Sequence, residues 1–236
     1  MVQNLISELK KLQNKDKAKI QQKFFKTGKG EYAEGDIFLG VIVPEVRKLA
    51  KKNLTLQFSD IFTLLSSKYH EVRLLGVIIL VYQYEKYSKE MNFVAQKTIV
   101  DFYLKNINFI NNWDLVDVSC YKILGHYCFQ TKSQTILKDL SYSKSLWERR
   151  ISIVSCFAFI KQAESEFLYS LIPKFLNDKE DLIHKACGWM LREAGKQNKE
   201  KLIEFLKNTH KFMPRIMFRY AIEKLSPQEK KAILNG

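Results

Sequence analysis

The sequence is poor in the residues that interrupt regular structure, and it has no long apolar run. Among 236 residues there are 9 glycines and 4 prolines, while 46% are hydrophobic. Collagen-like and disordered chains are therefore excluded. The longest apolar stretches, 74–82 and 151–160, are about half of the ~18 residues that cross a bilayer, so we expect buried helix faces and no membrane segment. Residues 1–11 mix charges with leucines and lack a signal core, so we expect no secretion and a cytoplasmic location.

Acidic residues are too few to balance the basic ones. The chain has 39 Lys and Arg against 25 Asp and Glu, a net charge of +14 spread along its length. A folded body this basic attracts polyanions, and contacts of Lys and Arg with phosphate supply the sequence-independent part of nucleic-acid binding. The charge favours a nucleic-acid partner. A lysine-rich proteome is the alternative explanation.

Motifs for metal and covalent chemistry are missing. The four cysteines lie in apolar segments without a CxxC pair or a histidine at zinc spacing, which predicts reduced core residues: Cys120, Cys128, Cys156 and Cys187. No HExxH or GxSxG occurs, and the glycines near Thr27 lack the spacing of a phosphate-binding loop. We therefore expect no metal, no cofactor and no nucleotide hydrolysis.

The apolar spacing predicts an all-α chain. No run alternates with period two, whereas apolar residues recur at three and four in 72–80 and 151–158. Four of the nine glycines fall in 27–43, which we expect to be a loop between helices. The prolines are placed where a first helical turn accepts them: Pro44, Pro173, Pro214 and Pro227. We expect roughly a dozen helices.

A weak internal repeat is present. Several apolar helices open with a basic residue, at Arg73, Arg150, Lys185 and Arg215. Their separations of several tens of residues predict a HEAT-like or armadillo-like helical-repeat solenoid, a single domain over 1–236 with a concave basic face. Pseudo-repeats of any all-helical protein are the alternative.

One helix of this series has an acidic residue at the equivalent position. It is predicted to start at Trp113, and it carries Asp117 where other repeats have a basic residue. Trp113 and Asp117 are four apart and share a helix face. Asn112 suits a helix cap and Asp114 a first turn, so both are structural by this interpretation. A packed tryptophan beside a surface aspartate is the competing view of the pair.

Two later segments carry further candidates. Arg149 and Arg150 point in different directions on a helix, so one can grip phosphate while the other pairs elsewhere. Trp189 follows Lys185 by one turn and adjoins Gly188, whose missing side chain lets another group approach closely. Core packing or a solvated charge is the alternative for each.

Three segments in this order and spacing resemble the AlkD-type DNA alkylation repair glycosylases: 113–117, 147–150 and 183–193. Residues 38–47 resemble the N-terminal part of that family. The resemblance implies a HEAT-like solenoid that grips duplex DNA on its concave face. It also implies hydrolysis of the N-glycosidic bond of positively charged N3- and N7-alkylated purines, without a metal and without flipping the base into a pocket.

The resemblance assigns roles by position. Asp117 matches the catalytic aspartate, Trp113 and Trp189 the aromatic cleft residues, and Arg150 an arginine that contacts phosphate. We expect the DNA backbone to be held also by the neighbouring basic residues Lys185, Arg149 and Arg73. The family's cleft tyrosine corresponds to Phe24 or Phe25, and the loop at 27–43 looks longer than in the best-known members, which bears on damage specificity.

The residue chemistry agrees with these roles. An alkylated purine cation is a good leaving group, and a carboxylate such as Asp117 can stabilise the positive sugar and orient water. Cation-π contact with a desolvated tryptophan is worth up to ~2 kcal/mol. We expect a sequence-indifferent monomer acting on double-stranded DNA that contains alkylated bases. The alternatives are a non-catalytic HEAT-like nucleic-acid-binding module, which leaves the acidic residue unexplained, and a protein-binding solenoid, which needs neither Asp117 nor Arg150.

Overall fold

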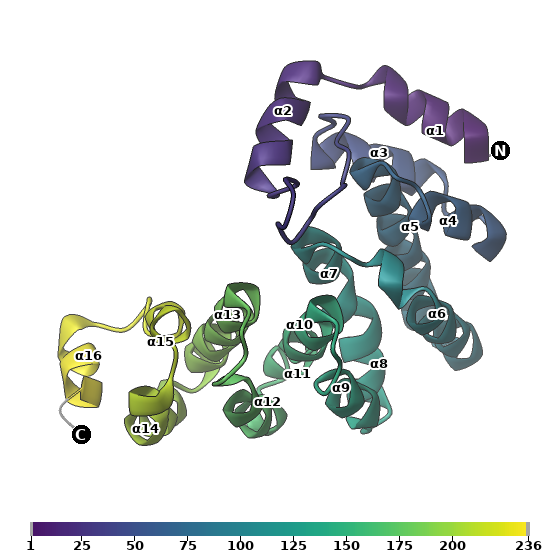
Figure 1. Cartoon of the computed structure of the whole chain (residues 1–236). Helices are drawn as coiled ribbons and strands as arrows, with labels where there is room; N and C mark the ends of the chain where they lie inside the picture. Colours follow the sequence, from purple (N-terminus) through teal and green to yellow (C-terminus); the bar gives the residue numbers. More distant parts are fainter. Residues whose placement is uncertain (1, 235–236) are drawn as a thin grey trace. The chain divides into compact units, whose positions relative to one another are not determined.

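The computed structural model describes residues 2–234 and confirms the all-α class (Figure 1). No strand occurs in this range, where the only extended pairing is an isolated bridge between Ile37 and Tyr69. The chain divides into two compact units, Met1–Ser119 and Cys120–Gly236. The single domain and the concave basic face stay predictions.

Unit 1 is organised around one buried helix, α5. Its helices are α1 (Val2–Lys11), α2 (Lys15–Phe24), α3 (Val43–Lys52), α4 (Phe58–Leu65), α5 (His70–Lys89), α6 (Phe93–Lys105), the 3-10 helix η1 (Ile107–Phe109) and α7 (Trp113–Cys120). The helices α3, α4 and α6 pack against α5. Every residue of α5 from His70 to Val81 is buried, and residues 74–81 are apolar on all sides.

Unit 2 is a succession of short helices around α10 and α13. Its elements are the π-helix η2 (Tyr121–Gly125), α8 (His126–Gln130), α9 (Thr135–Leu140), α10 (Leu146–Ser155), α11 (Phe157–Ile160), α12 (Glu166–Leu171), the 3-10 helix η3 (Ile172–Phe175), α13 (Asp181–Gln197), α14 (Lys199–Thr209), the 3-10 helix η4 (His210–Phe212), α15 (Arg215–Ala221) and α16 (Pro227–Leu234). Helix α10 packs against α9, α11 and α13, and α13 packs against α14 and α15.

Several local predictions are confirmed. Pro44 and Pro227 lie in the first turns of α3 and α16, and Pro214 directly precedes α15. The four cysteines are free and buried, and burial raises the pKa of Cys128 to about 12. None of the helices in residues 2–234 combines the length and the apolar character that a bilayer crossing needs.

The long connection between α2 and α3 is held by one buried carboxylate. Glu71 of α5 accepts hydrogen bonds from the backbone N–H groups of Leu39, Gly40 and Val41, at 2.9, 2.8 and 3.2 Å. Gly40 has φ of 81°, and a Cβ there would lie 2.0 Å from the carbonyl oxygen of Asn14. Only glycine fits this position, because both the backbone angle and the close approach of α2 exclude a side chain.

Candidate functional site

Helix α7 carries the two residues that the sequence singles out in unit 1. Trp113 is its first residue and Asp117 its fifth, and both are half-buried. The indole of Trp113 stacks on Phe25, with ring centroids 5.0 Å apart and planes 10° from parallel. Phe24 meets the same indole edge-on at 5.8 Å. Phe24 is 65% exposed and Phe25 only 8%, so Phe24 is the surface aromatic beside Trp113.

The stack continues inward from Phe25. The ring centroids of Phe25 and Phe38 are 4.8 Å apart, and those of Phe38 and His70 are 4.4 Å apart. Both pairs are stacked. These buried rings form a rigid backing for Trp113, because aromatic groups in a close-packed core have little freedom to move.

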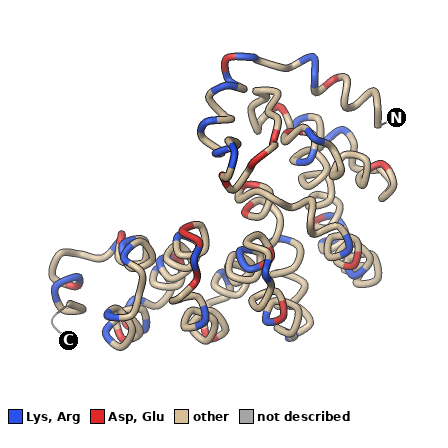
Figure 2. The backbone as a smooth tube through the Cα atoms, viewed as in Figure 1, with Lys and Arg blue, Asp and Glu red and all other residues tan. Residues whose placement is uncertain are grey.

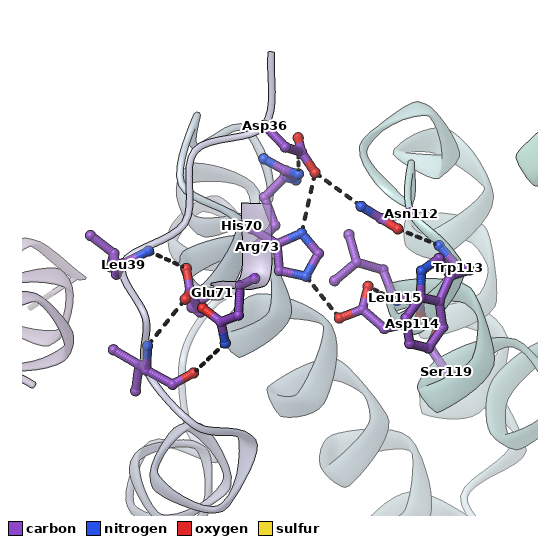
Figure 3. A network of polar contacts seen from close by, with 12 residues as sticks. Asp36, Leu39, His70, Glu71, Arg73, Asn112, Trp113, Asp114, Leu115 and Ser119 are labelled. Carbon is purple, nitrogen blue, oxygen red and sulfur yellow. Dashed lines mark hydrogen bonds and ion pairs between the residues drawn. The ribbon is translucent and has the colours of Figure 1, made fainter. Parts of the chain in front are cut away.

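A polar network anchors the start of α7 (Figure 3). Asn112 accepts from the backbone N–H of Trp113 at 2.8 Å and donates to Asp36 at 3.2 Å. Asp114 accepts from the N–H of Leu115 through one oxygen and contacts Nε2 of His70 at 2.8 Å through the other. The structural roles predicted for Asn112 and Asp114 therefore extend across unit 1 to the loop before α3 and to α5.

The ring of His70 is charged at neutral pH. Burial alone would lower its pKa, but the carboxylates of Asp114 and Asp36 outweigh that effect and raise it to about 9. Asp36 has the complementary behaviour: burial opposes ionisation, yet hydrogen bonds from His70 and Asn112 and the charge of Arg73 hold the pKa of its carboxyl below the usual value.

Arg73 does not lie where the sequence analysis expects it. Its guanidinium is buried, 4% exposed, and donates to Asp36 at 2.6 Å and to the carbonyl of Ser67 at 3.0 Å. A phosphate contact would require this buried ion pair to break. Arg73 therefore fixes the loop that carries Asp36, and its contact with the DNA backbone stays a prediction.

In unit 2, α10 is tied to the beginning of α13 through two adjacent arginines. Arg149 makes a two-pronged ion pair with Asp178, at 2.7 and 3.1 Å, and donates to two backbone carbonyls. Arg150 is buried, 5% exposed, and donates to the carbonyl of Leu182 at 2.6 Å. The two arginines have different partners. Arg149 is paired with Asp178, and its contact with the DNA backbone stays a prediction.

Helix α13 carries the remaining candidates. Lys185 and Trp189 are half-buried and one turn apart. The ring centroids of Trp189 and Phe157 are 6.2 Å apart. No hydrogen bond or ion pair involves the Lys185 side chain within residues 2–234. A Cβ on Gly188 would lie 2.4 Å from the carbonyl oxygen of Met217. The close partner of Gly188 is therefore α15 of the protein itself, and not an external molecule.

Three candidate residues occupy the same position in their helices. Asp117, Arg150 and Lys185 are each the fifth residue of their helices, α7, α10 and α13. The acidic residue therefore stands at the position where the other two helices have a basic one.

Unit 1 also has a lysine-rich helix that the sequence analysis does not single out. No residue of α2 is buried, and Ile20 and Phe24 are 68% and 65% exposed. Figure 2 shows basic residues along this helix. Six exposed lysines of α2 and the adjoining loop have no acidic partner in the described part of the chain: Lys15, Lys17, Lys19, Lys23, Lys26 and Lys29.

Comparison with known proteins identifies the family. The model of the DNA alkylation repair enzyme family matches residues 5–225. This chain belongs to the DNA alkylation repair enzyme family. Its general role is therefore in DNA repair, with DNA as its substrate.

Two solved structures share the fold of this repair protein. One, described as a predicted DNA alkylation repair enzyme from Enterococcus faecalis, has 18% identity and a TM-score of 0.67 over 91% of this chain and 97% of that chain. The other, smu.31 of Streptococcus mutans, has 18% identity and a TM-score of 0.54 over 95% and 99%. A search of curated proteins gives no match.

His70 and Glu71 were not predicted as functional residues from the sequence, and for Arg73 the buried partner was missed. His70, Glu71 and Arg73 open a helix that is otherwise apolar to Val81, and ionisable groups buried in such a helix need partners. That contrast is the signal that could have found them. The partner Asp36 lies in the loop that the local pattern leaves undefined. Across residues 2–234, no group of three or more His, Cys, Asp or Glu side chains could hold a metal ion.

Proposed function

We propose that this protein is a DNA glycosylase of base excision repair. It hydrolyses the N-glycosidic bond of positively charged N3- and N7-alkylated purines in duplex DNA. The observation that carries the proposal is Asp117: a half-buried carboxylate one turn from an aromatic ring, at the helix position where α10 and α13 have Arg150 and Lys185. The family membership supports it.

The bond that breaks joins the anomeric carbon of the sugar to the purine nitrogen. Its electron pair leaves with the base, whose positive charge is thereby neutralised, so no strong general acid is needed. The sugar is left with positive charge, which a nearby carboxylate stabilises. In this proposal Asp117 has that role and orients the water that adds to the anomeric carbon, and the water's proton is lost to solvent.

Aromatic rings select the charged lesion. Trp113 is fixed on one side by Phe25 and has Phe24 at its edge, so a rigid aromatic surface stands one turn before Asp117. A cation gains up to ~2 kcal/mol against a desolvated indole, which corresponds to roughly thirtyfold selectivity over the neutral base. For Trp189, the same role stays a prediction from the family resemblance.

Phosphate contacts hold the duplex without reading sequence. We assign these contacts to Lys185 and the exposed lysines of α2 and its loop, because a basic side chain with no acidic partner is available to neutralise a phosphate. Arg150 is kept among them on the family resemblance alone. Phosphate contacts of Arg73 and Arg149 stay predictions only, because buried or two-pronged ion pairs occupy these side chains. Monomeric action on DNA stays part of the proposal.

The direct test is release of 7-methylguanine and 3-methyladenine from alkylated duplex DNA in the presence of a chelator. The proposal predicts free base from alkylated DNA, none from undamaged DNA, and abasic sites in equal amount. Salt-sensitive DNA binding without any base release would contradict it and would favour the non-catalytic nucleic-acid-binding module.

A second experiment tests the DNA-holding surface separately. Replacing Lys19 and Lys23 by glutamine should lower the slope of log affinity against log salt by about 0.9 for each phosphate that the variant no longer neutralises. Lys48→Gln is the matched control, because Lys48 is exposed and already paired with Glu45 at 2.7 Å. An unchanged slope in the double variant would remove α2 from the interface.

A further inference from the structure

His70 lies between two carboxylates of different segments. Its Nδ1 is 3.3 Å from Asp36 of the loop before α3, and its Nε2 is 2.8 Å from Asp114 of α7. A neutral imidazole has a single N–H, so it could donate to only one of them and would turn a lone pair toward the other. Both contacts are hydrogen bonds only when the ring is an imidazolium, which agrees with its raised pKa of about 9.

The groups around this ring form a balanced and enclosed set. His70 and Arg73 of α5 face Asp36 and Asp114, two positive charges against two negative ones. Glu71, the adjacent acid on α5, is occupied by three backbone N–H groups of the loop. Stacked rings of Phe25 and Phe38 cover the imidazole, which is 1% exposed.

Stability alone does not account for such a set. Three buried charges and the partly buried Asp114 cost desolvation, and well-packed apolar side chains in their place are often equally or more stabilising. Apolar groups cannot supply directional hydrogen bonds. Asp114 also binds the N–H of Leu115, and Asn112 joins Asp36 to the N–H of Trp113, so the ends of the network are the backbone of the first turn of α7.

We propose that His70 is a positioning residue for base removal: its two N–H groups fix the first turn of α7 and thereby the placement of Trp113 and Asp117. This inference rests on the proposed glycosylase function. His70 itself does not touch the lesion in this proposal, since its ring is 1% exposed and is in contact with Phe25 and Phe38. A displacement of ~1 Å in a catalytic group can cost ~100-fold in rate, so a weakened tether acts on catalysis more than on DNA binding.

The test compares wild type with His70→Gln, which removes the charge and donates from a single amide nitrogen instead of from two ring nitrogens. The rate of base release from saturated alkylated duplex should fall at least ~10-fold, while the Kd for the same DNA changes less than ~2-fold. Wild type should also lose activity as the pH passes about 9, and the variant should show no such limb. His210→Gln, on the 3-10 helix η4 of unit 2, is the matched control and should behave as wild type.

Two measurements do not depend on base release. Amide hydrogen exchange at residues 113–116 should be at least ~10-fold faster in His70→Gln, because the first turn of α7 loses its tether. Histidine-selective NMR of the wild type should show the His70 ring losing its proton near pH 9. If His70→Gln does not fold, two wild-type measurements decide the inference. They are the histidine-selective NMR titration of His70 and the pH profile of base release.

Equal rates and equal α7 exchange in wild type and variant would overturn the inference, as would a ring that is neutral at pH 7. If wild type releases no base, the proposed function fails by itself. The α7 exchange rates then decide this inference, with equal rates overturning the tether and faster exchange in the variant supporting it.

Discussion

As the pH rises from 6.5 to about 9, loss of the proton from His70 should lower the free energy of unfolding of unit 1. In the unfolded chain the histidine has its ordinary pKa near 6.5, and in the folded chain about 9, so between these values the native state binds one proton more. Stability from this group is therefore complete below pH 6.5 and is lost as the pH rises through 9. A shift of this size corresponds to about 3 kcal/mol, and the 1% exposure of the ring leaves little solvent screening.

The assay is urea unfolding followed by circular dichroism at a series of pH values, for wild type and for His70→Gln. Taking the difference between the two proteins cancels the other titrating groups. The difference should be largest at pH 6.5 and below, and should shrink by about 3 kcal/mol toward pH 9.5. Parallel stability curves over the whole range would refute the assignment of a charged His70.

Three further predictions follow from the packing. Glu71→Gln should lower the free energy of unfolding by about 1.5–3 kcal/mol in thermal melts, because charge-assisted hydrogen bonds to the loop are removed, whereas Glu45→Gln, on an exposed ion pair, should cost under ~1 kcal/mol. Gly188→Ala should lower the free energy of unfolding by about 1–3 kcal/mol, since its Cβ would meet α15. Gly28→Ala is the control and should be near neutral, because its Cβ would meet only the far end of the Glu31 side chain. Equal melting temperatures of the two variants would contradict this prediction. Iodoacetamide should label the four buried cysteines only after unfolding, and rapid labelling of the native protein, for instance at Cys128 with its pKa of about 12, would show that the core is open.

Helices and their beginnings could be predicted because they depend on neighbours in sequence. Apolar spacing located α5 and α10, and Asn112 followed by Trp113 marked the start of α7. The shared face of Trp113 and Asp117 follows from the helix alone. These local features were enough to indicate the family.

The partners of the charged side chains could not be predicted from local pattern. Arg73 pairs with Asp36, 37 residues away, and Arg149 with Asp178, 29 residues away. An arginine that opens an apolar helix looks the same in sequence whether it faces phosphate or a buried carboxylate. Tertiary packing decides which partner the arginine meets. For Arg73 and Arg149 that partner is a carboxylate of the protein itself.

Gly188 shows the same dependence on tertiary packing. The missing side chain correctly indicated a close approach, but the approaching group is the backbone of Met217 on α15. Sequence gives the requirement for space at such a position and says nothing of what fills it.

The central claim concerns the carboxylate of Asp117, and one comparison tests it most directly. Release of 7-methylguanine or 3-methyladenine from alkylated duplex DNA is measured in chelator for wild type and Asp117→Asn at equal DNA occupancy. Asp101→Asn serves as the control, because Asp101 is an exposed acid of α6 paired with Lys97. The account predicts release by wild type and by the control, and a fall of at least ~100-fold in Asp117→Asn, about 2.7 kcal/mol of barrier. Equal release by all three proteins would contradict a catalytic role for Asp117.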